Sequence, residues 1–169
     1  DGIAYVNDLA ELKGALGDKN VKEIEFASSI EINEDITITK NILVVQKEVY
    51  IKGSLTVEAT LTLGGAIFEN TGNIIVTNKG FLGVYMTELN NQSEVTVKKD
   101  GVMEIDRGGQ FMNYGRLINE GKVIVTSNGG SFNNHPSGTI ENNGIIDCTG
   151  YYSNYGTYKG TGAEPVPTN

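Results

Sequence analysis

Phe68-Glu-Asn70-Thr-Gly72-Asn-Ile74 is the first copy of a short pattern that returns until the chain ends. Its asparagine recurs at a nearly constant spacing of 21, 22, 21 and 20 residues. The repeated positions are Asn70, Asn91, Asn113, Asn134 and Asn154. A fixed period near twenty residues is typical of a solenoid. The sequence therefore predicts similar rungs stacked along one axis.

Apolar residues in this chain alternate with polar ones and recur in pairs about every six residues. Early pairs are Ile24/Phe26, Ile30/Ile32 and Ile36/Ile38. Period-two alternation is typical of β-strands with one buried face. A 21-residue period then holds three short strands, which predicts a three-sided parallel β-helix. Hairpin meanders would not return the same asparagine to every third strand.

The inward side chains of one predicted wall form a column that allows the rungs to be counted. This column is Ile36, Leu55, Ile74, Val95, Leu117, Ile140 and Tyr158. It predicts an all-β domain of about six to seven rungs, which at about 4.8 Å per rung makes a rod about 30 Å long.

The two ends of the chain differ from the repeats. Residues 7–17 place apolar side chains at positions 9, 12, 15 and 16 behind an Asn/Asp cap, which predicts a short amphipathic helix over the first rung. We expect a single β-helix domain over residues 1–160. Residues 161–169 lack the repeat and contain two of the three prolines, so we expect a linker or tail that leads to further domains.

Composition restricts the possible partners. The 169 residues carry 13 Lys and Arg against 21 Asp and Glu, a net charge of −8, and contain no basic run. Nucleic acid and anionic membranes are therefore poor partners. No apolar run is long enough to span a membrane. The single cysteine, Cys148, leaves no internal disulfide and is expected to point into the core.

The helical start, the strand periodicity and the stacked asparagines together resemble the pectate-lyase-like right-handed parallel β-helix superfamily. The chain is most similar in pattern, from Tyr5 to about Gly160, to the noncatalytic adhesive modules of Gram-positive surface proteins. The resemblance implies a right-handed coil and places the asparagine column in the turn between the second and third strands of each rung. Asparagine suits such a turn because its amide bonds a neighbouring rung and because it tolerates a left-handed backbone. Glycines at 72, 115, 138 and 156 are expected to supply similar freedom.

For function, the resemblance implies a secreted or cell-surface bacterial protein that serves adhesion or acts as a spacer. We expect a monomeric domain of a longer chain whose partner is a host or cell-wall glycan or protein. The alternatives are a glycan-binding module and a polysaccharide lyase or hydrolase.

Enzymatic relatives of this fold place carboxylates and a basic residue on one exposed strand face. The matching candidates are Glu104, Asp106 and Asp147, with Arg107 or Arg116 as the base of a lyase. The repeat predicts Asp106 and Asp147 in one column, two rungs or about 9.6 Å apart, which would suit an inverting pair of carboxylates. The turns are too short to build cleft walls, however, and Arg116 is expected on a different face from Glu104. We therefore predict no catalytic residues.

The sequence also predicts neither a metal site nor a cofactor. His135 is the only histidine and lies on an expanded turn with Pro136 and Ser137, so a zinc site has no second histidine and no nearby cysteine. Cys148 and His135 are expected on different turns, which argues against a catalytic thiol.

Two surface features remain open to interpretation. Tyr151 and Tyr155 are candidates for stacking sugar rings, whereas Tyr152 and Tyr158 are expected to point inward and complete the core. Thr37, Thr56 and Thr96 share an outward column that Ile75, Ile118 and Glu141 interrupt. This mixed face could bind a neighbouring domain or ice, although strand propensity alone explains its β-branched residues.

Overall fold

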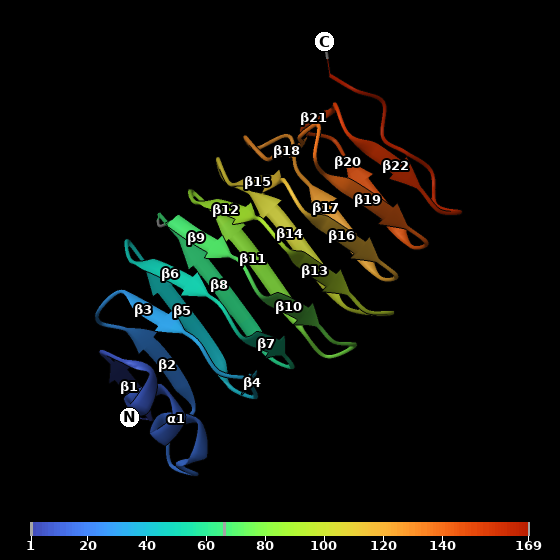
Figure 1. Cartoon of the computed structure of the whole chain (residues 1–169). Helices are drawn as coiled ribbons and strands as arrows, with labels where there is room; N and C mark the ends of the chain where they lie inside the picture. Colours follow the sequence, from blue (N-terminus) through green and yellow to red (C-terminus); the bar gives the residue numbers. More distant parts are fainter. Residues whose placement is uncertain (1, 66, 169) are drawn as a thin grey trace.

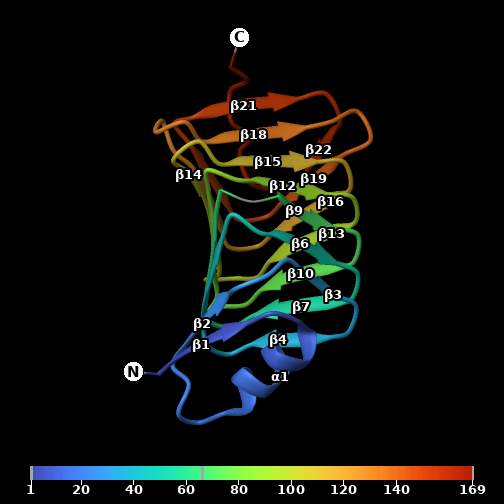
Figure 2. The same ribbon diagram turned by 90° about the vertical axis from the view of Figure 1, so that its left-hand side faces the viewer.

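The computed structural model describes residues 2–65 and 67–168 and is a three-sided parallel β-helix of seven rungs (Figures 1 and 2). Residues 1 and 169, the outer limits of the two segments predicted above, lie outside this description. The first sheet, in spatial order, consists of β1 (Ile3–Val6), β2 (Glu23–Phe26), β5 (Asn41–Val45), β8 (Thr60–Gly64), β11 (Phe81–Tyr85), β14 (Val102–Asp106), β17 (Lys122–Val125) and β20 (Ile145–Cys148).

The other two walls have seven strands each. The second sheet consists of β3 (Ile30–Ile32), β6 (Glu48–Ile51), β9 (Ile67–Asn70), β12 (Glu88–Asn91), β15 (Gln110–Asn113), β18 (Ser131–Asn134) and β21 (Tyr151–Asn154). The third sheet consists of β4 (Ile36–Ile38), β7 (Ser54–Val57), β10 (Asn73–Val76), β13 (Glu94–Val97), β16 (Arg116–Asn119), β19 (Thr139–Asn142) and β22 (Thr157–Lys159).

Every strand pairs in parallel with its equivalent in the neighbouring rung. In the third sheet the paired inward residues run from Ile36 to Tyr158, through all five intermediate positions predicted above. The predicted inward column and three-strand rung are therefore confirmed.

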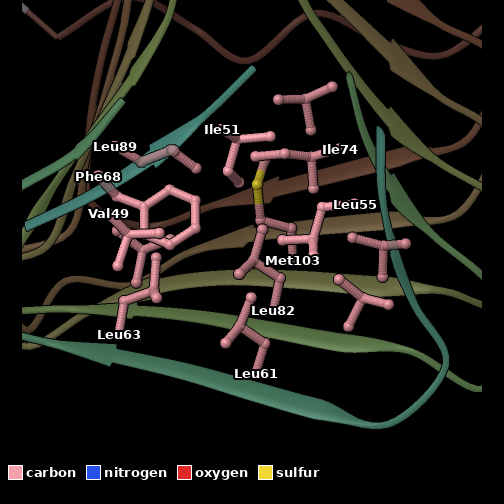
Figure 3. Packing of buried hydrophobic residues seen from close by; sticks show 14 of the residues in the cluster. Val49, Ile51, Leu55, Leu61, Leu63, Phe68, Ile74, Leu82, Leu89 and Met103 are labelled. Carbon is pink, nitrogen blue, oxygen red and sulfur yellow. The ribbon is translucent and has the colours of Figure 1, made fainter. Parts of the chain in front are cut away.

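The core is a narrow apolar interior to which all three sheets contribute (Figure 3). Leu61 and Met103 enter from the first sheet, Phe68 from the second and Leu55 from the third, and all are at most 2% exposed. Towards the last rung, aromatic rings continue the second-sheet column, with Phe132 lying 5.1 Å from Phe111 and 5.5 Å from Tyr152 between ring centroids. Burial of one such side chain contributes about 1.5–3 kcal/mol.

The predicted asparagine ladder is present at the second corner, where each second-sheet strand turns into the third sheet. The amides of Asn70, Asn91, Asn113, Asn134 and Asn154 bond in sequence, each Nδ2 donating to the next Oδ1 at 2.8–2.9 Å. The first four side chains are fully buried. Because buried amides are costly to leave unpaired, the ladder favours one register of the rungs.

A second ladder, which we did not predict, lies at the third corner, where the third sheet turns into the first. Asn119 Nδ2 donates to Asn142 Oδ1 at 2.8 Å, and Asn142 Nδ2 donates to Tyr158 Oη at 2.8 Å. Both asparagines are fully buried and each precedes a glycine by two positions, as in the first ladder. That shared Asn-x-Gly spacing was the sequence signal for it.

The backbone explanation expected for these turns is wrong. Neither the ladder asparagines nor the glycines at 72, 115, 138 and 156 adopt a positive φ. Glycine is needed instead because the neighbouring rung is too close, since a Cβ on Gly115 would lie 2.2 Å from the Ser93 carbonyl oxygen. Left-handed residues occur at other corners, as described below.

The N-terminal end of the rod is covered by α1 (Leu9–Gly17), as predicted. The Asp8 side chain caps the helix by accepting a 2.8 Å bond from the Glu11 N–H. Leu12 and Ala15 are buried against the first rung, and Lys40 Nζ donates to the Ala15 carbonyl at 2.9 Å. The sequence analysis placed the first strand after this helix, whereas the structure adds β1 before it.

The C-terminal end is covered by the tail, which turns back over the last rung. Glu164 Oε1 accepts bonds from Asn154 Nδ2 at 2.7 Å and from Tyr152 Oη at 2.9 Å. Thr168 N–H donates to the Tyr152 carbonyl at 2.8 Å. The tail therefore terminates the first ladder, and its role as a linker to further domains stays a prediction.

Candidate functional site

The acidic candidates lie on the outer face of the first sheet, but their predicted register is wrong. Glu104 pairs with Ile124, which pairs with Asp147. Asp147 therefore shares its column with Glu104 and not with Asp106, and the predicted pair of Asp106 and Asp147 does not exist. The two carboxylates that stand two rungs apart, about 9.6 Å, are those of Glu104 and Asp147, with Ile124 between them.

Glu104 belongs to a compact cluster with an aromatic ring and a guanidinium group. Tyr85 Oη donates to Glu104 Oε1 at 2.6 Å, and Arg107 Cζ lies 5.2 Å from the centre of the Tyr85 ring. The ring also covers Gly83, where an added Cβ would lie 2.8 Å from Tyr85 Cζ. Burial and the hydrogen bond to Glu104 raise the pKa of Tyr85, so the phenol stays protonated and continues to donate.

Asp106 is held by groups of its own and of the next rung. The Thr126 hydroxyl donates to its carboxylate, and Arg107 Nε lies 3.6 Å away. These contacts hold the pKa of Asp106 below its usual value. Such a carboxylate is a poor proton acceptor near neutral pH, and it fixes the local turn instead.

The remaining charged candidates form ion pairs on other parts of the surface. Asp147 lies 3.9 Å from Lys122, and Arg116 on the third sheet bridges Glu141 at 2.6 Å and Glu94 at 3.6 Å. The hydrogen bond to Glu141 raises the pKa of Arg116. The prediction that Arg116 and Glu104 stand on different faces is confirmed, so they cannot act on one substrate atom.

Two hollows flank the first corner, where the first sheet turns into the second. The hollow on the first-sheet side has a volume of about 280 Å³ and is lined by Leu43, Val45, Gly64, Tyr85, Met86 and Arg107, among others. The hollow on the second-sheet side has a volume of about 410 Å³ and includes Lys47, Glu48, Ile67, Met86, Glu88 and Gln110 in its lining. Sequence analysis missed this region because no motif marks it.

The backbone of the first corner is left-handed in successive rungs. Gln46, Met86 and Arg107 have φ values of 53°, 50° and 50°, and Gly65 has a φ of 64°. All four line the first-sheet hollow. A left-handed conformation costs a non-glycine residue about 1–2 kcal/mol. Backbone strain of this kind concentrates at functional sites.

The candidate tyrosines do not come together. Tyr151 begins β21 and Tyr155 follows its last residue, so about 13 Å of extended chain separates them. Both are exposed, and their role in glycan binding stays a prediction. Tyr152 is fully buried and Tyr158 packs against the core, which confirms the inward positions expected for them.

His135 and Cys148 lie at different corners, as expected. His135 follows the ladder position of its rung and stacks on Tyr114, with ring centroids 4.0 Å apart. Cys148 packs against the core in the last rung, where burial raises the pKa of its thiol. The predicted outward column of Thr37, Thr56, Ile75, Thr96, Ile118 and Glu141 is present on the third sheet.

Within residues 2–65 and 67–168, no three His, Cys, Asp or Glu side chains are grouped so that they could hold a metal ion. In the same part of the chain, no helix has the length and apolar character needed to cross a membrane. Comparison with known proteins finds no matching family model, curated protein or solved structure.

Proposed function

We propose that the chain is a noncatalytic, rod-shaped module of a secreted or cell-surface protein, where it serves adhesion or holds its neighbours apart. The observation that carries this proposal is the position of the two chain ends, which leave the rod at opposite ends (Figures 1 and 2). Six steps between seven rungs separate these ends by about 29 Å. The likeness to pectate-lyase-like adhesive modules of Gram-positive bacteria belongs to the same proposal.

Rigidity of the rod supports this role. The fully buried amides of Asn91 and Asn113 hydrogen-bond to the rungs on both sides of each. Bending or slipping the rungs would break these bonds where water cannot replace them. A rod with such a ladder keeps a fixed length under load, which suits a spacer or a presenting surface.

The state of the acidic residues also supports a noncatalytic role. Glu104 accepts from Tyr85, Asp106 accepts from Thr126, and Asp147 lies beside Lys122. A general base must reach the substrate proton that it abstracts. These carboxylates have partners on the protein and lie on an open strand face.

The experiment combines an activity assay with a binding assay on the same sample. We expect no unsaturated products and no new reducing ends from a panel of neutral and acidic polysaccharides between about pH 5 and 10, the range over which a carboxylate, phenol or guanidinium base could act. We expect saturable binding to an array of immobilised extracellular proteins and glycans.

The matched variant for this experiment carries Glu104→Gln with Asp106→Asn. Polysaccharide turnover by the wild-type chain that this variant lacks, while it keeps its circular dichroism spectrum, would replace the proposal with an enzyme. Absence of binding across the whole array would overturn adhesion and leave the spacer role.

A further inference from the structure

An apolar surface occupies the first corner in the middle of the rod. It consists of Leu43, Val45, Ile67 and Met86, which are 37%, 46%, 45% and 64% exposed, and we call it the corner patch. Among the described residues, the other large hydrophobic side chains with this exposure lie in β1, in the last rung or in the tail. The corner patch is thus separate from the rod ends, where exposure follows from the end of the stack. Clustered exposed apolar residues mark interaction sites.

The backbone of this corner indicates that its side chains are used. Met86 keeps a side chain at a φ of 50°, although Gly65, one rung away, shows that glycine fits the same corner at a φ of 64°. A glycine at position 86 would remove the strain. A strained residue that is also 64% exposed gains little from packing inside this chain, so its gain must come from contact with another molecule.

Acidic side chains flank the corner patch on the second sheet. Glu48 pairs with Ile67, which pairs with Glu88, so two glutamates stand one rung on either side of an exposed apolar residue. Glu31 and Glu69 lie in the neighbouring outward column of the same face. Of the two cations at the corner, Lys47 is free to move, and Arg107 lies over Tyr85 and 3.6 Å from Asp106. The negative charge of this face, within a chain of net charge −8, complements a cationic partner.

We propose that the corner patch binds a basic, extended polypeptide segment of a partner protein. An aliphatic side chain of that segment fills the 280 Å³ hollow beside Val45 and Met86, and its lysine or arginine side chains face Glu48 and Glu88. This inference deepens the adhesion proposal and rests on it.

Two other occupants fit the same surface less well. A pyranose ring needs a free aromatic face, but the Tyr85 ring has Gly83 beneath it and the Arg107 guanidinium above it. A second copy of this chain would bring two acidic faces of net charge −8 together, which electrostatic repulsion opposes.

The test uses the full chain, labelled with ¹⁵N, and a synthetic peptide of alternating lysine and leucine as the probe. We expect amide shifts on titration that are concentrated at Val45, Gln46, Met86 and Glu88. A glutamate–leucine peptide of equal length and a neutral cello-oligosaccharide should not shift these resonances. Saturation of the same residues by the oligosaccharide, or no shift with the lysine peptide, would overturn the proposal.

Two glycine substitutions separate binding from folding. Met86→Gly relieves the left-handed backbone, so the melting temperature should stay the same or rise, while affinity for the lysine peptide falls about tenfold. Asp100→Gly is the matched control, because Asp100 has a φ of 67° at a different corner. It should relieve strain equally and leave peptide affinity unchanged. Equal affinity of the Met86→Gly and wild-type chains would sink the proposal.

Charge is tested with the double variant Glu48→Gln and Glu88→Gln, which should weaken peptide binding and reduce its salt dependence. Retained affinity and salt dependence in this variant would contradict the predicted cationic partner. Failure at this corner is distinct from failure of the proposed function, because polysaccharide turnover and array binding are measured without the peptide.

Discussion

A buried asparagine amide must find partners for two donors and an acceptor, and the rungs of this rod supply them by repetition. Asn113 accepts from Asn91, then donates to Asn134 at 2.8 Å and to the Thr139 carbonyl at 3.2 Å. Each amide therefore depends on the rung before it and the rung after it. Satisfied buried networks of this kind strengthen their members, and a missing member leaves its neighbours unpaired.

Replacing Asn113 by Leu should destabilise the fold by about 1–3 kcal/mol for each polar group that it leaves unpaired. Leucine has a similar volume but can neither accept from Asn91 nor donate to Asn134. Urea unfolding followed by circular dichroism measures the loss. Asn73→Ala on the exposed outer face is the control and should change little. Equal midpoints for Asn113→Leu and wild type would show that the ladder does not contribute to stability.

Glycine at the second corner permits close approach of the rungs, so Gly115→Ala should be destabilising. The new Cβ would lie 2.2 Å from the Ser93 carbonyl oxygen, and the backbone would have to move at a cost of about 1–3 kcal/mol. Gly14→Ala is the opposite case, because Gly14 lies within α1 with no atom within 4 Å of its Cβ position. It should stabilise the chain by about 0.5–1 kcal/mol. Two shifts of the same sign in thermal unfolding would refute this explanation.

At the scale of elements, the two ends of the rod are closed in different ways. The helix α1 buries Leu12 and Ala15, whereas the tail is largely exposed and holds the last rung through polar contacts. In the last rung Ile146 and Cys148 are only partly buried, although their counterparts one rung earlier, Val123 and Val125, are fully buried. The C-terminal end is therefore the less completely covered of the two.

Glu164 is the residue that connects the tail to the ladder, so Glu164→Ala should lower stability by about 1–2 kcal/mol. The Asn154 amide and the buried Tyr152 hydroxyl would lose their common acceptor. Amide exchange should become faster in residues 152–158 and stay unchanged in α1. Glu164→Gln keeps an uncharged acceptor and should recover part of the loss, while Glu120→Ala on an exposed turn should have no effect. Uniform faster exchange along the rod would contradict a local role for the tail.

At the scale of the whole molecule, stability comes from contacts between neighbouring rungs, repeated along one axis. No described residue group offers a metal ion three ligands, so we predict that EDTA and millimolar calcium leave the melting temperature unchanged. A tight native-state site would raise stability by several kcal/mol at saturating ion concentrations. Differential scanning calorimetry with and without calcium measures this. A clear calcium-dependent rise would restore Glu104, Asp106 and Asp147 as candidate ligands.

The sequence by itself determined the features that repetition requires. Equivalent positions of stacked rungs share one environment, so the asparagine ladder and the inward column from Ile36 to Tyr158 could be predicted from spacing alone. Asn119 and Asn142 carried the same Asn-x-Gly signal, and their ladder was open to the same reasoning.

Tertiary structure alone decided the features that depend on which residues become neighbours across rungs. Alternation fixes the face of a side chain, but a slip of two residues keeps every face unchanged, so the sequence could not distinguish Asp147 beside Ile124 from Asp147 beside Thr126. The corner patch has no motif for a related reason. Its hollows arise because left-handed turns and glycines of separate rungs meet at one corner, and Tyr85 lies flat only because Gly83 leaves space beneath it.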